Sequence, residues 1–305
     1  MSAPRAVLPA LATLAALLLT ACGGTAGGDG GDGGDAAETR TVPTARGDVE
    51  VPADPQRVVV LEPVQLDTAV ALGAVPAGAA VLTEASGVPD YLGAMAQDVS
   101  VVGTVTEPDL ERIAALSPDL VLGTDSRHAE LYDRLSAIAP TAFMTTQTDP
   151  WRDNAAFVGR VLGREDETAT LLADLDARCA EVAGTHDSGT AQMIRPRDGL
   201  LTLYGPTSFA GSVMECAGFT IPERDWEDSI SVDLSPELVL EARADEVFVT
   251  AADPSSPDAV PPALTDVRDE AFPRLHVVDQ SYWISGVGPL GGQRVLDDVE
   301  RVLSG

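Results

Sequence analysis

Residues 108–124 read PDLERIAALSPDLVLGT, and residues 234–250 read LSPELVLEARADEVFVT. Each segment has the pattern of a helix, then a short turn containing Asp, then a buried strand. Aligned without gaps, the two segments share Glu111/Glu237, Asp119/Asp245, Val121/Val247 and Thr124/Thr250. This internal similarity predicts two similar lobes that face one another.

Short apolar runs alternate with helical patterns on both sides of these segments, which is typical of α/β architecture. We expect strands at residues 57–61, 79–82, 99–102, 120–122, 142–144, 200–203, 247–249 and 277–278. We expect helices at residues 65–72, 109–116, 129–138 and 293–303. The predicted fold class is α/β, with two lobes that are each a central, mostly parallel sheet flanked by helices.

A long helical stretch separates the two blocks of alternating pattern. Residues 150–162 and 165–183 read as helices with a break at Gly163, and the second has one apolar stripe at spacings of three and four. A helix over residues 165–183 would span about 28 Å. We therefore predict an N-terminal lobe at 55–148, a rigid linking helix at 149–184 and a C-terminal lobe at 185–305.

The amino terminus has the pattern of an export signal. The apolar run 6–21 follows Arg5 and is too short to cross a bilayer, so residues 1–21 are predicted to be a signal peptide. The run ends in Leu19-Thr20-Ala21-Cys22, which resembles the bacterial lipobox, where the cysteine is diacylated and becomes the first mature residue. The alternative is ordinary signal cleavage beside an incidental cysteine.

Lipid on Cys22 would hold the protein on the membrane, because two acyl chains anchor stably where one does not. Residues 23–37 are almost all Gly, Asp and Ala and cannot bury apolar surface. We predict a lipid-anchored flexible tether at 22–54 and an extracytoplasmic location at the cell membrane.

Composition excludes several classes of function. The 305 residues include 48 acidic and 19 basic side chains, a formal net charge of -29, and every basic residue is arginine. The absence of lysine excludes P-loop, Schiff-base and Ser-Lys chemistry. The acidity argues against nucleic acid as a partner, because phosphate binding needs a positive surface.

Six segments between Arg57 and the carboxyl end occur in an order and spacing that are informative together: RVVVLEPVQLDTAVALG, PDLERIAALSPDLVLG, RHAELYDRLSAIAPT, YGPTSFAGSVMECAGF, SPELVLEARADEVFV and YWISGVGPLGG. In these segments the chain resembles the helix-linked substrate-binding proteins of ABC importers for iron-siderophores, and their cobalamin and haem relatives. The resemblance implies two lobes joined by one long helix, a ligand in the cleft and small closure motion.

The resemblance also implies the function. We expect a monomer that is not an enzyme, captures a ferric siderophore and delivers it to an ABC permease. Iron would be held by the chelator, with no metal ion bound directly and no cofactor besides the lipid. The alternatives are a haem- or cobalamin-binding importer component, with His128 as a possible haem ligand, and an exported α/β hydrolase.

Ligands of α/β lobes bind beyond the carboxyl ends of the strands. A guanidinium can grip the anionic oxygens of a chelate, and aromatic walls can cover its organic frame. The candidate ligand-binding residues are Arg127, Trp283, Tyr282, Tyr204, Tyr91, Phe209 and Trp226. Arg127 matches a pocket arginine of similar siderophore binders; a surface ion pair with Glu130 is the alternative. For the aromatic residues the alternative is core packing.

The charge of the ligand can also be inferred. Some relatives carry a second arginine in the loop matching GPTSFAG, where this chain has Phe209. With one candidate pocket arginine, a neutral or cationic hydroxamate chelate fits better than a tris-catecholate, unless Arg224 or Arg152 also reaches the site.

Two further residue pairs complete the predicted site. Glu111 and Glu237 fall in the first turn of one helix in each lobe, and the resemblance implies that such glutamates dock onto arginines of the permease. Stabilisation of the helix dipole is the alternative, and both can hold together. Cys179 and Cys216 fall on predicted helices beside the second sheet; export permits a disulfide, and two separate thiols remain the alternative.

Overall fold

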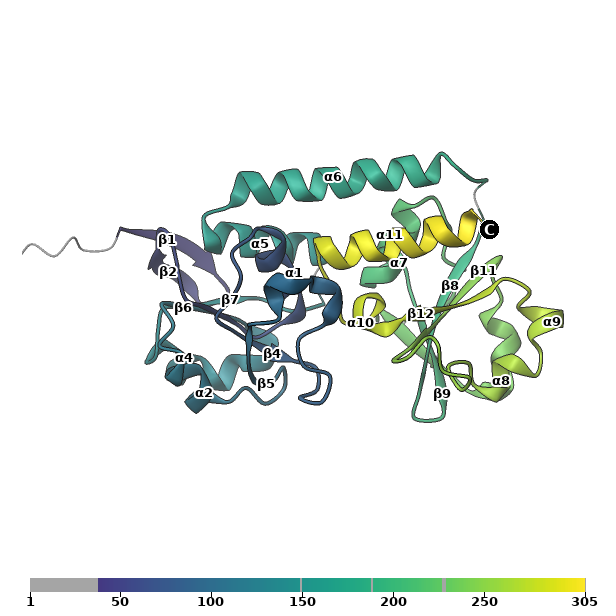
Figure 1. Cartoon of the computed structure of the whole chain (residues 1–305), viewed down its shortest axis with the longest axis horizontal. Helices are drawn as coiled ribbons and strands as arrows, with labels where there is room; N and C mark the ends of the chain where they lie inside the picture. Colours follow the sequence, from purple (N-terminus) through teal and green to yellow (C-terminus); the bar gives the residue numbers. More distant parts are fainter. Residues whose placement is uncertain (1–37, 149, 188, 227–228, 305) are drawn as a thin grey trace, which may run out of the picture. The chain divides into compact units, whose positions relative to one another are not determined.

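Two five-stranded sheets, each with helices around it, and a separate two-stranded hairpin form the fold (Figure 1). The computed structural model describes residues 38–148, 150–187, 189–226 and 229–304, which lie within one unit, Ala37–Gly305. Cys22, the signal peptide and the Gly-rich stretch lie outside the described residues.

The first sheet has the strand order β5-β4-β3-β6-β7, and all its strands are parallel. Its strands are β3 (Val58–Val60), β4 (Gly78–Val81), β5 (Ser100–Thr104), β6 (Leu120–Thr124) and β7 (Thr141–Met144). Its helices are α1 (Pro63–Ala71), α2 (Leu110–Ala115), α3 (Asp125–His128) and α4 (Tyr132–Ser136), with short 3-10 turns η1 (Asp90–Leu92), η2 (Ala94–Ala96) and η3 (Ala129–Leu131). All residues of β3, β4, β6 and β7 are buried, as expected of parallel strands covered on both faces.

The second sheet has the order β10-β9-β8-β11-β12, in which β8, β11 and β12 are parallel and β9 and β10 antiparallel. Its strands are β8 (Ala191–Arg197), β9 (Leu200–Tyr204), β10 (Ser231–Leu234), β11 (Glu246–Ala251) and β12 (Leu275–Asp279). Its helices are α7 (Phe209–Cys216), η4 (Pro236–Ala242), α8 (Pro262–Thr265), α9 (Arg268–Ala271), α10 (Gln280–Trp283) and α11 (Pro289–Leu303). The predicted α/β class with two mostly parallel sheets is confirmed.

Strand β8, at the centre of the second sheet, is missing from the sequence prediction, which starts the C-terminal alternation at residue 200. The polar side chains of Gln192 and Arg195 hide its pattern. Gln192 is buried, and its amide donates to the carbonyls of Met193 and Tyr204. The turn to β9 is Asp198-Gly199, with both residues at positive φ, the geometry that favours a two-residue hairpin.

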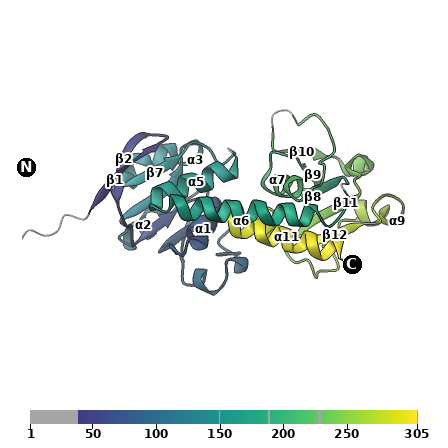
Figure 2. The ribbon, with the colours of Figure 1, turned by 90° about the horizontal axis from the view of Figure 1, so that it is seen from above.

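Two consecutive helices, α5 (Trp151–Leu162) and α6 (Glu165–Ala183), lie between the sheets in the sequence, as predicted. The break is at Gly163, whose left-handed backbone ends α5. Helix α6 packs against α5, α7 and α11, and Figure 2 shows it alongside α11. A disulfide between Cys179 on α6 and Cys216 on α7 ties these two helices together.

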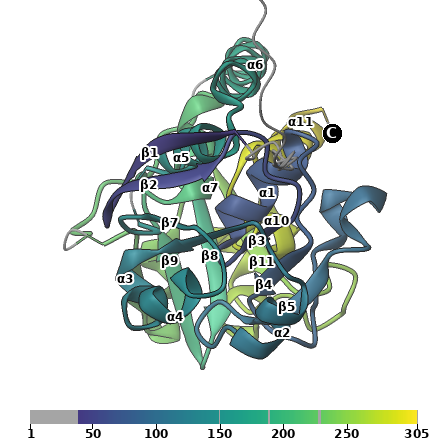
Figure 3. The same cartoon turned by 90° about the vertical axis from the view of Figure 1, so that its left-hand side faces the viewer.

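A hairpin of β1 (Thr39–Thr44) and β2 (Gly47–Pro52) stands where the sequence predicts flexible tether. It contacts β7, and Ala45 N–H donates to the carbonyl of Phe143 over 2.9 Å (Figure 3). Val42 and Val51 are buried on one face of the hairpin. Residues 39–52 are therefore part of the folded structure, because alternating valines give this short stretch an apolar face.

The internal similarity of the sequence corresponds to a shared structural role. Asp119, just before β6, accepts hydrogen bonds from the backbone N–H groups of Gln56 and Arg57, which precede β3. Asp245, just before β11, accepts from the backbone N–H and hydroxyl of Thr190, which precedes β8. Each aspartate thus fastens the start of the neighbouring parallel strand. The two segments differ in their helices, because η4 is a 3-10 helix with a kink at Leu238 where α2 is an α-helix.

Candidate functional site

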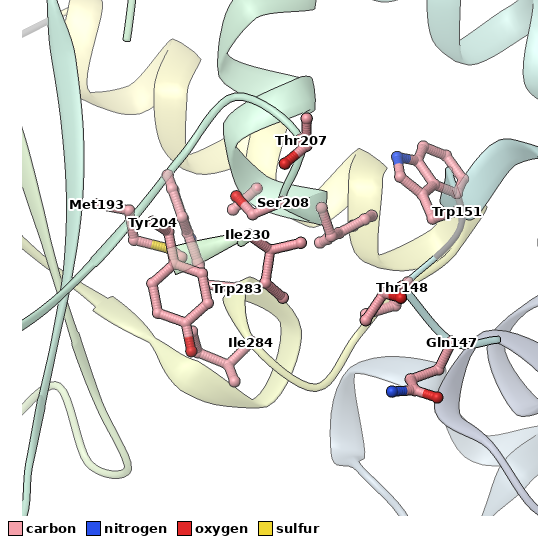
Figure 4. A pocket seen from close by; sticks show the side chains of 13 residues that line it. Gln147, Thr148, Trp151, Met193, Tyr204, Thr207, Ser208, Ile230, Trp283 and Ile284 are labelled. Carbon is pink, nitrogen blue, oxygen red and sulfur yellow. The ribbon is translucent and has the colours of Figure 1, made fainter. Parts of the chain in front are cut away.

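A pocket lined by aromatic side chains lies where the β7–α5 connection meets α7 and α10 (Figure 4). Its volume is about 480 Å³, part of it open to solvent. Four aromatic residues line this aromatic pocket: Trp151, Tyr204, Phe209 and Trp283. Figure 4 shows Tyr204, Trp283 and Ile284 together, with Trp151 and Gln147 on the opposite side. None of the described residues that line the pocket is charged.

Local contacts hold one side of the aromatic pocket. The indole N–H of Trp151 donates to the hydroxyl of Ser212 over 3.0 Å, and its ring meets Phe209 edge-on at 5.2 Å. Ser208 is the N-cap of α7, where its hydroxyl accepts from Gly211 N–H. This cap sets Phe209 at the first residue of the helix.

The other side of the pocket depends on a buried carboxylate of α11. Asp298 accepts hydrogen bonds from the Trp283 indole and the Tyr282 hydroxyl, each at 2.8 Å. Trp283 is 1% exposed and stacks on Phe248, so most of its ring is core. Tyr282 does not line the aromatic pocket; it lies beside Tyr91, with ring centres 6.0 Å apart.

A second and larger pocket, of about 1180 Å³ with part of it open to solvent, is lined in part by other residues of the segment 280–285. Its lining includes Arg195 in the carboxyl half of β8, Ala252 after β11 and Asp279 at the end of β12. Leu82, after β4 of the first sheet, lines it as well, so carboxyl ends of parallel strands from both sheets converge here, as the strand rule predicts. We call it the arginine pocket.

Tyr91 lines the arginine pocket with its ring, while its hydroxyl is directed toward helix α1. The hydroxyl donates to Asp67 of α1 over 2.9 Å. Asp67 also accepts from the backbone N–H groups of Leu290 and Gly291 at the start of α11. Burial raises the pKa of Asp67 to about 7, although these hydrogen bonds act to lower it. Only the ring of Tyr91 is thus available to a ligand.

Arg195 is a site residue that sequence reasoning missed. It follows Met193, a residue of the aromatic pocket, by two positions in β8 and therefore lies on the same face of the sheet. It is half-buried, and its guanidinium forms no hydrogen bond or ion pair with the residues described. The signal that could have found it is the Asp198-Gly199 turn, which indicates a preceding strand.

Arg127 lies outside both pockets as their described linings define them. Its guanidinium donates to Glu62 over 2.9 Å, so its ion-pair partner is not Glu130. Glu62 is 1% exposed; burial raises its pKa to about 7, while Arg127 acts to lower it. The arginine is the counter-ion of a buried carboxylate, and its contact with a ligand stays a prediction.

Trp226 is half-buried and packs against Gly205, where an added Cβ would come within 2.8 Å of its ring. The guanidinium of Arg224 lies over the same ring. Arg152 lies over the Trp151 ring and pairs with Asp176. These arginines are therefore engaged within the protein.

Glu111 and Glu237 occupy matching places in the two lobes. Both are exposed, and they lie in the first turns of α2 and η4. Neither carboxylate has a hydrogen bond or ion pair with the described residues. The arrangement suits either a partner surface or the helix dipole.

The histidine considered as a haem ligand, His128, is already hydrogen-bonded within the protein. The Nδ1 of His128 accepts from Thr124 N–H, its Nε2 lies 2.8 Å from the carbonyl of Val105, and burial lowers its pKa. Both ring nitrogens are thus used within the protein, which leaves neither for haem iron.

Within residues 38–304, the described side chains form no cluster that could hold a metal ion, and no described helix is long and apolar enough to cross a membrane.

Comparisons with known proteins show which protein family has this architecture. The family model described as "Periplasmic binding protein" matches residues 58–260. The chain is 30% identical over 285 residues to the "Probable siderophore-binding lipoprotein YfiY" of Bacillus subtilis, covering 87% of each chain. It is 31% identical over 186 residues to the "Fe(3+) dicitrate-binding periplasmic protein FecB" of Escherichia coli, covering 60% of this chain and 62% of that protein.

The fold is also similar to solved structures. The crystal structure of Staphylococcus aureus SirA complexed with staphyloferrin B superposes with a TM-score of 0.73 and 26% identity. The match covers 87% of this chain and 99% of that one.

Proposed function

The chain belongs to the periplasmic binding protein family, as its sequence predicts, and from this we propose that it is the extracytoplasmic substrate-binding component of an ABC importer for a ferric siderophore. One observation carries the proposal: loops from both sheets line two adjoining pockets, of which one is aromatic. Several relatives are named for the binding of siderophores or ferric chelates, which supports the ligand class.

The ligand would lie in the cleft between the lobes. Residues 55–148 with the β1–β2 hairpin would form the N-terminal lobe, α5 and α6 the link, and residues 185–305 the C-terminal lobe. The aromatic pocket and the arginine pocket share the segment 280–285, so one ligand can contact both. Iron would stay bound to the chelator throughout.

The protein would bind its ligand without turnover. Ser208 does not lie in the Gly-x-Ser-x-Gly frame of a hydrolase nucleophile, and its hydroxyl is engaged as a helix cap. His128, a potential base, is held by the backbone through both nitrogens. These contacts argue against the hydrolase alternative.

Membrane attachment and delivery complete the proposal. Lipid on Cys22 would tether the protein to the outer face of the cell membrane, in keeping with a relative that is named a lipoprotein. Glu111 and Glu237, exposed on both lobes, would then dock onto basic residues of the permease.

Ligand titration tests the proposal directly. The chain with Cys22→Ser, purified without its signal peptide, would be titrated with a ferric hydroxamate, a ferric catecholate, ferric citrate, haemin and cobalamin. Trp151 and Trp283 line the aromatic pocket, so we expect one ferric siderophore to quench tryptophan fluorescence saturably at micromolar or lower concentration. Saturable binding of haemin or cobalamin alone, or of none of the five, would contradict the siderophore assignment.

A further inference from the structure

We propose that the ligand is a ferric chelate with two unlike parts: an uncharged hydroxamate part in the aromatic pocket and one carboxylate in the arginine pocket, paired with Arg195. This inference rests on the proposed function and names the chemical class of its ligand. Four observations lead to it: the missing counter-ion of Arg195, the charges around Arg195, the neutral lining of the aromatic pocket, and the segment 280–285 that lines both pockets.

The guanidinium of Arg195 lacks an internal counter-ion. Most of the other arginines in the described part form ion pairs with Asp or Glu. Arg195 is half-buried against a pocket and has no such partner among the described residues, in a chain whose net charge is -29. A partly desolvated charge is costly unless it is paired. A carboxylate of the ligand would supply the missing partner through a bidentate, charge-assisted contact.

The rest of the arginine pocket limits how much negative charge it can accept. Asp90 and Asp279 line the same pocket, so its described charged side chains are one guanidinium and two carboxylates. Asp279 is also the N-cap of α10, where it accepts from Ser281 N–H. Hydroxyl groups of Thr83, Ser86 and Ser285 supply neutral hydrogen-bonding partners. The pocket thus suits one carboxylate and repels a chelate that carries several negative charges.

The aromatic pocket has the opposite character. Its described lining contains four aromatic rings and no charge, which suits the uncharged face of a hydroxamate chelate. Trp283 and Ile284 line this pocket, whereas Gln280, Ser281 and Ser285 line the other. Neighbouring residues of one short segment, 280–285, therefore line both pockets, so that a single chelate can contact both.

A matched pair of ligands tests the inference. Desferrioxamine B acylated with acetyl gives a neutral ferric complex, and acylation with succinyl adds one free carboxylate to the same complex. We expect the Cys22→Ser chain to bind the succinyl complex about 10- to 100-fold more tightly, the range for a hydrogen bond to a charged group. Arg195→Gln should remove this preference, and Arg195→Lys should keep part of it, because lysine retains the charge without the bidentate geometry.

Arg134→Gln is the matched control, since Arg134 is exposed and has no side-chain partner among the described residues. It should preserve the preference. Thermal melting of each unliganded variant separates loss of folding from loss of the contact. Equal affinity for both complexes in the parent, or a preference that survives Arg195→Gln, would overturn the inference and leave the proposed function standing.

Two other outcomes also separate the inference from the proposed function. Binding of a catecholate or citrate chelate together with rejection of both hydroxamate complexes would overturn only the assigned chemical class. Failure of every ferric siderophore to bind would contradict the proposed function itself.

Discussion

Buried carboxylates set the orientation of the aromatic residues around both pockets. Asp298 accepts from the polar atoms of Tyr282 and Trp283, and Asp67 accepts from the hydroxyl of Tyr91. The polar ends of these three aromatic residues are therefore turned toward the protein. Of the three, Tyr91 lines the arginine pocket and Trp283 lines the aromatic pocket, whereas Tyr282 lines neither. Each carboxylate would therefore influence ligand binding indirectly, by fixing the position of the aromatic side chain that donates a hydrogen bond to it.

Asp298→Ala should lower the free energy of unfolding by about 2–3 kcal/mol, because it leaves the buried indole N–H of Trp283 without an acceptor. Urea unfolding would measure this change. Asp297→Ala is the control, since Asp297 is an exposed neighbour that pairs with Arg178 and Arg294. An equal loss in both variants would show that the contacts to the aromatic residues do not matter.

The raised pKa values of Asp67 and Glu62 predict that the free energy of unfolding falls as the pH rises. Both carboxyls have their pKa raised to about 7, above the ordinary values of 3.8 and 4.5. At a pH between the ordinary pKa of each group and its raised pKa in the folded protein, the folded state holds a proton that the unfolded state releases. Their contribution to stability is thus complete below pH 4 and is lost as the pH rises through 7, by about 1.4 kcal/mol per pH unit for each group.

Urea unfolding of the parent at pH 5.5, 6.5 and 7.5 should show the free energy of unfolding falling as the pH rises. Asp67→Asn should make this fall shallower, because it removes one of the two titrating groups. Asp98→Asn, at an exposed position without a described side-chain partner, should leave it unchanged. A slope in Asp67→Asn equal to that of the parent would mean that Asp67 does not titrate in this range.

Among the elements, α6, α7 and α11 form the support beneath the aromatic pocket. Helix α7 begins at Phe209 and α11 carries Asp298, and α6 packs against both helices. The disulfide Cys179–Cys216 joins α6 to α7 across a sequence separation of 37. The covalent link therefore lies close to the element that presents Phe209.

Removing this disulfide should destabilise the protein. Closing a loop of this length restricts the unfolded chain and stabilises the fold by about 3–4 kcal/mol. We expect Cys179→Ala/Cys216→Ala to lower the free energy of unfolding by this amount, measured in urea without reductant. In the presence of reductant the parent should approach the variant. Identical unfolding curves for the oxidised parent and the variant would show that the link adds no stability.

For the whole molecule, the matching places of Glu111 and Glu237 suggest that the two lobes meet a partner in similar ways. The similar segments that carry them begin at equivalent points before β6 and β11. A hydrogen bond to a charged group contributes about 1.5–3 kcal/mol, so loss of both should weaken docking severely.

Glu111→Gln/Glu237→Gln should therefore leave siderophore affinity unchanged and reduce uptake of the ferric complex by cells at least about 10-fold. The control is Glu130→Gln/Glu270→Gln, which changes one exposed glutamate in each half of the chain. Radiolabelled iron uptake compares the variants at equal protein levels. Uptake equal to that of the control would remove the docking role.

The fold class, the bounds of α6, the break at Gly163 and the family were all predicted correctly from the sequence. These features depend on periodicity, turn residues and motif order, which are readable in short windows of sequence. The sequence also indicated that a ligand would bind beyond the carboxyl ends of the strands, and residues that follow strands line both pockets.

Which charged residue faces a pocket became clear from the three-dimensional packing alone. Arg127 is paired with Glu62, a residue 65 positions away, and Arg195 reaches a pocket from a strand whose polar residues concealed it. The hairpin at 39–52 likewise gains its buried face from β7, far along the chain. Partners of this kind are brought together by packing between distant segments, which no local pattern in the sequence encodes.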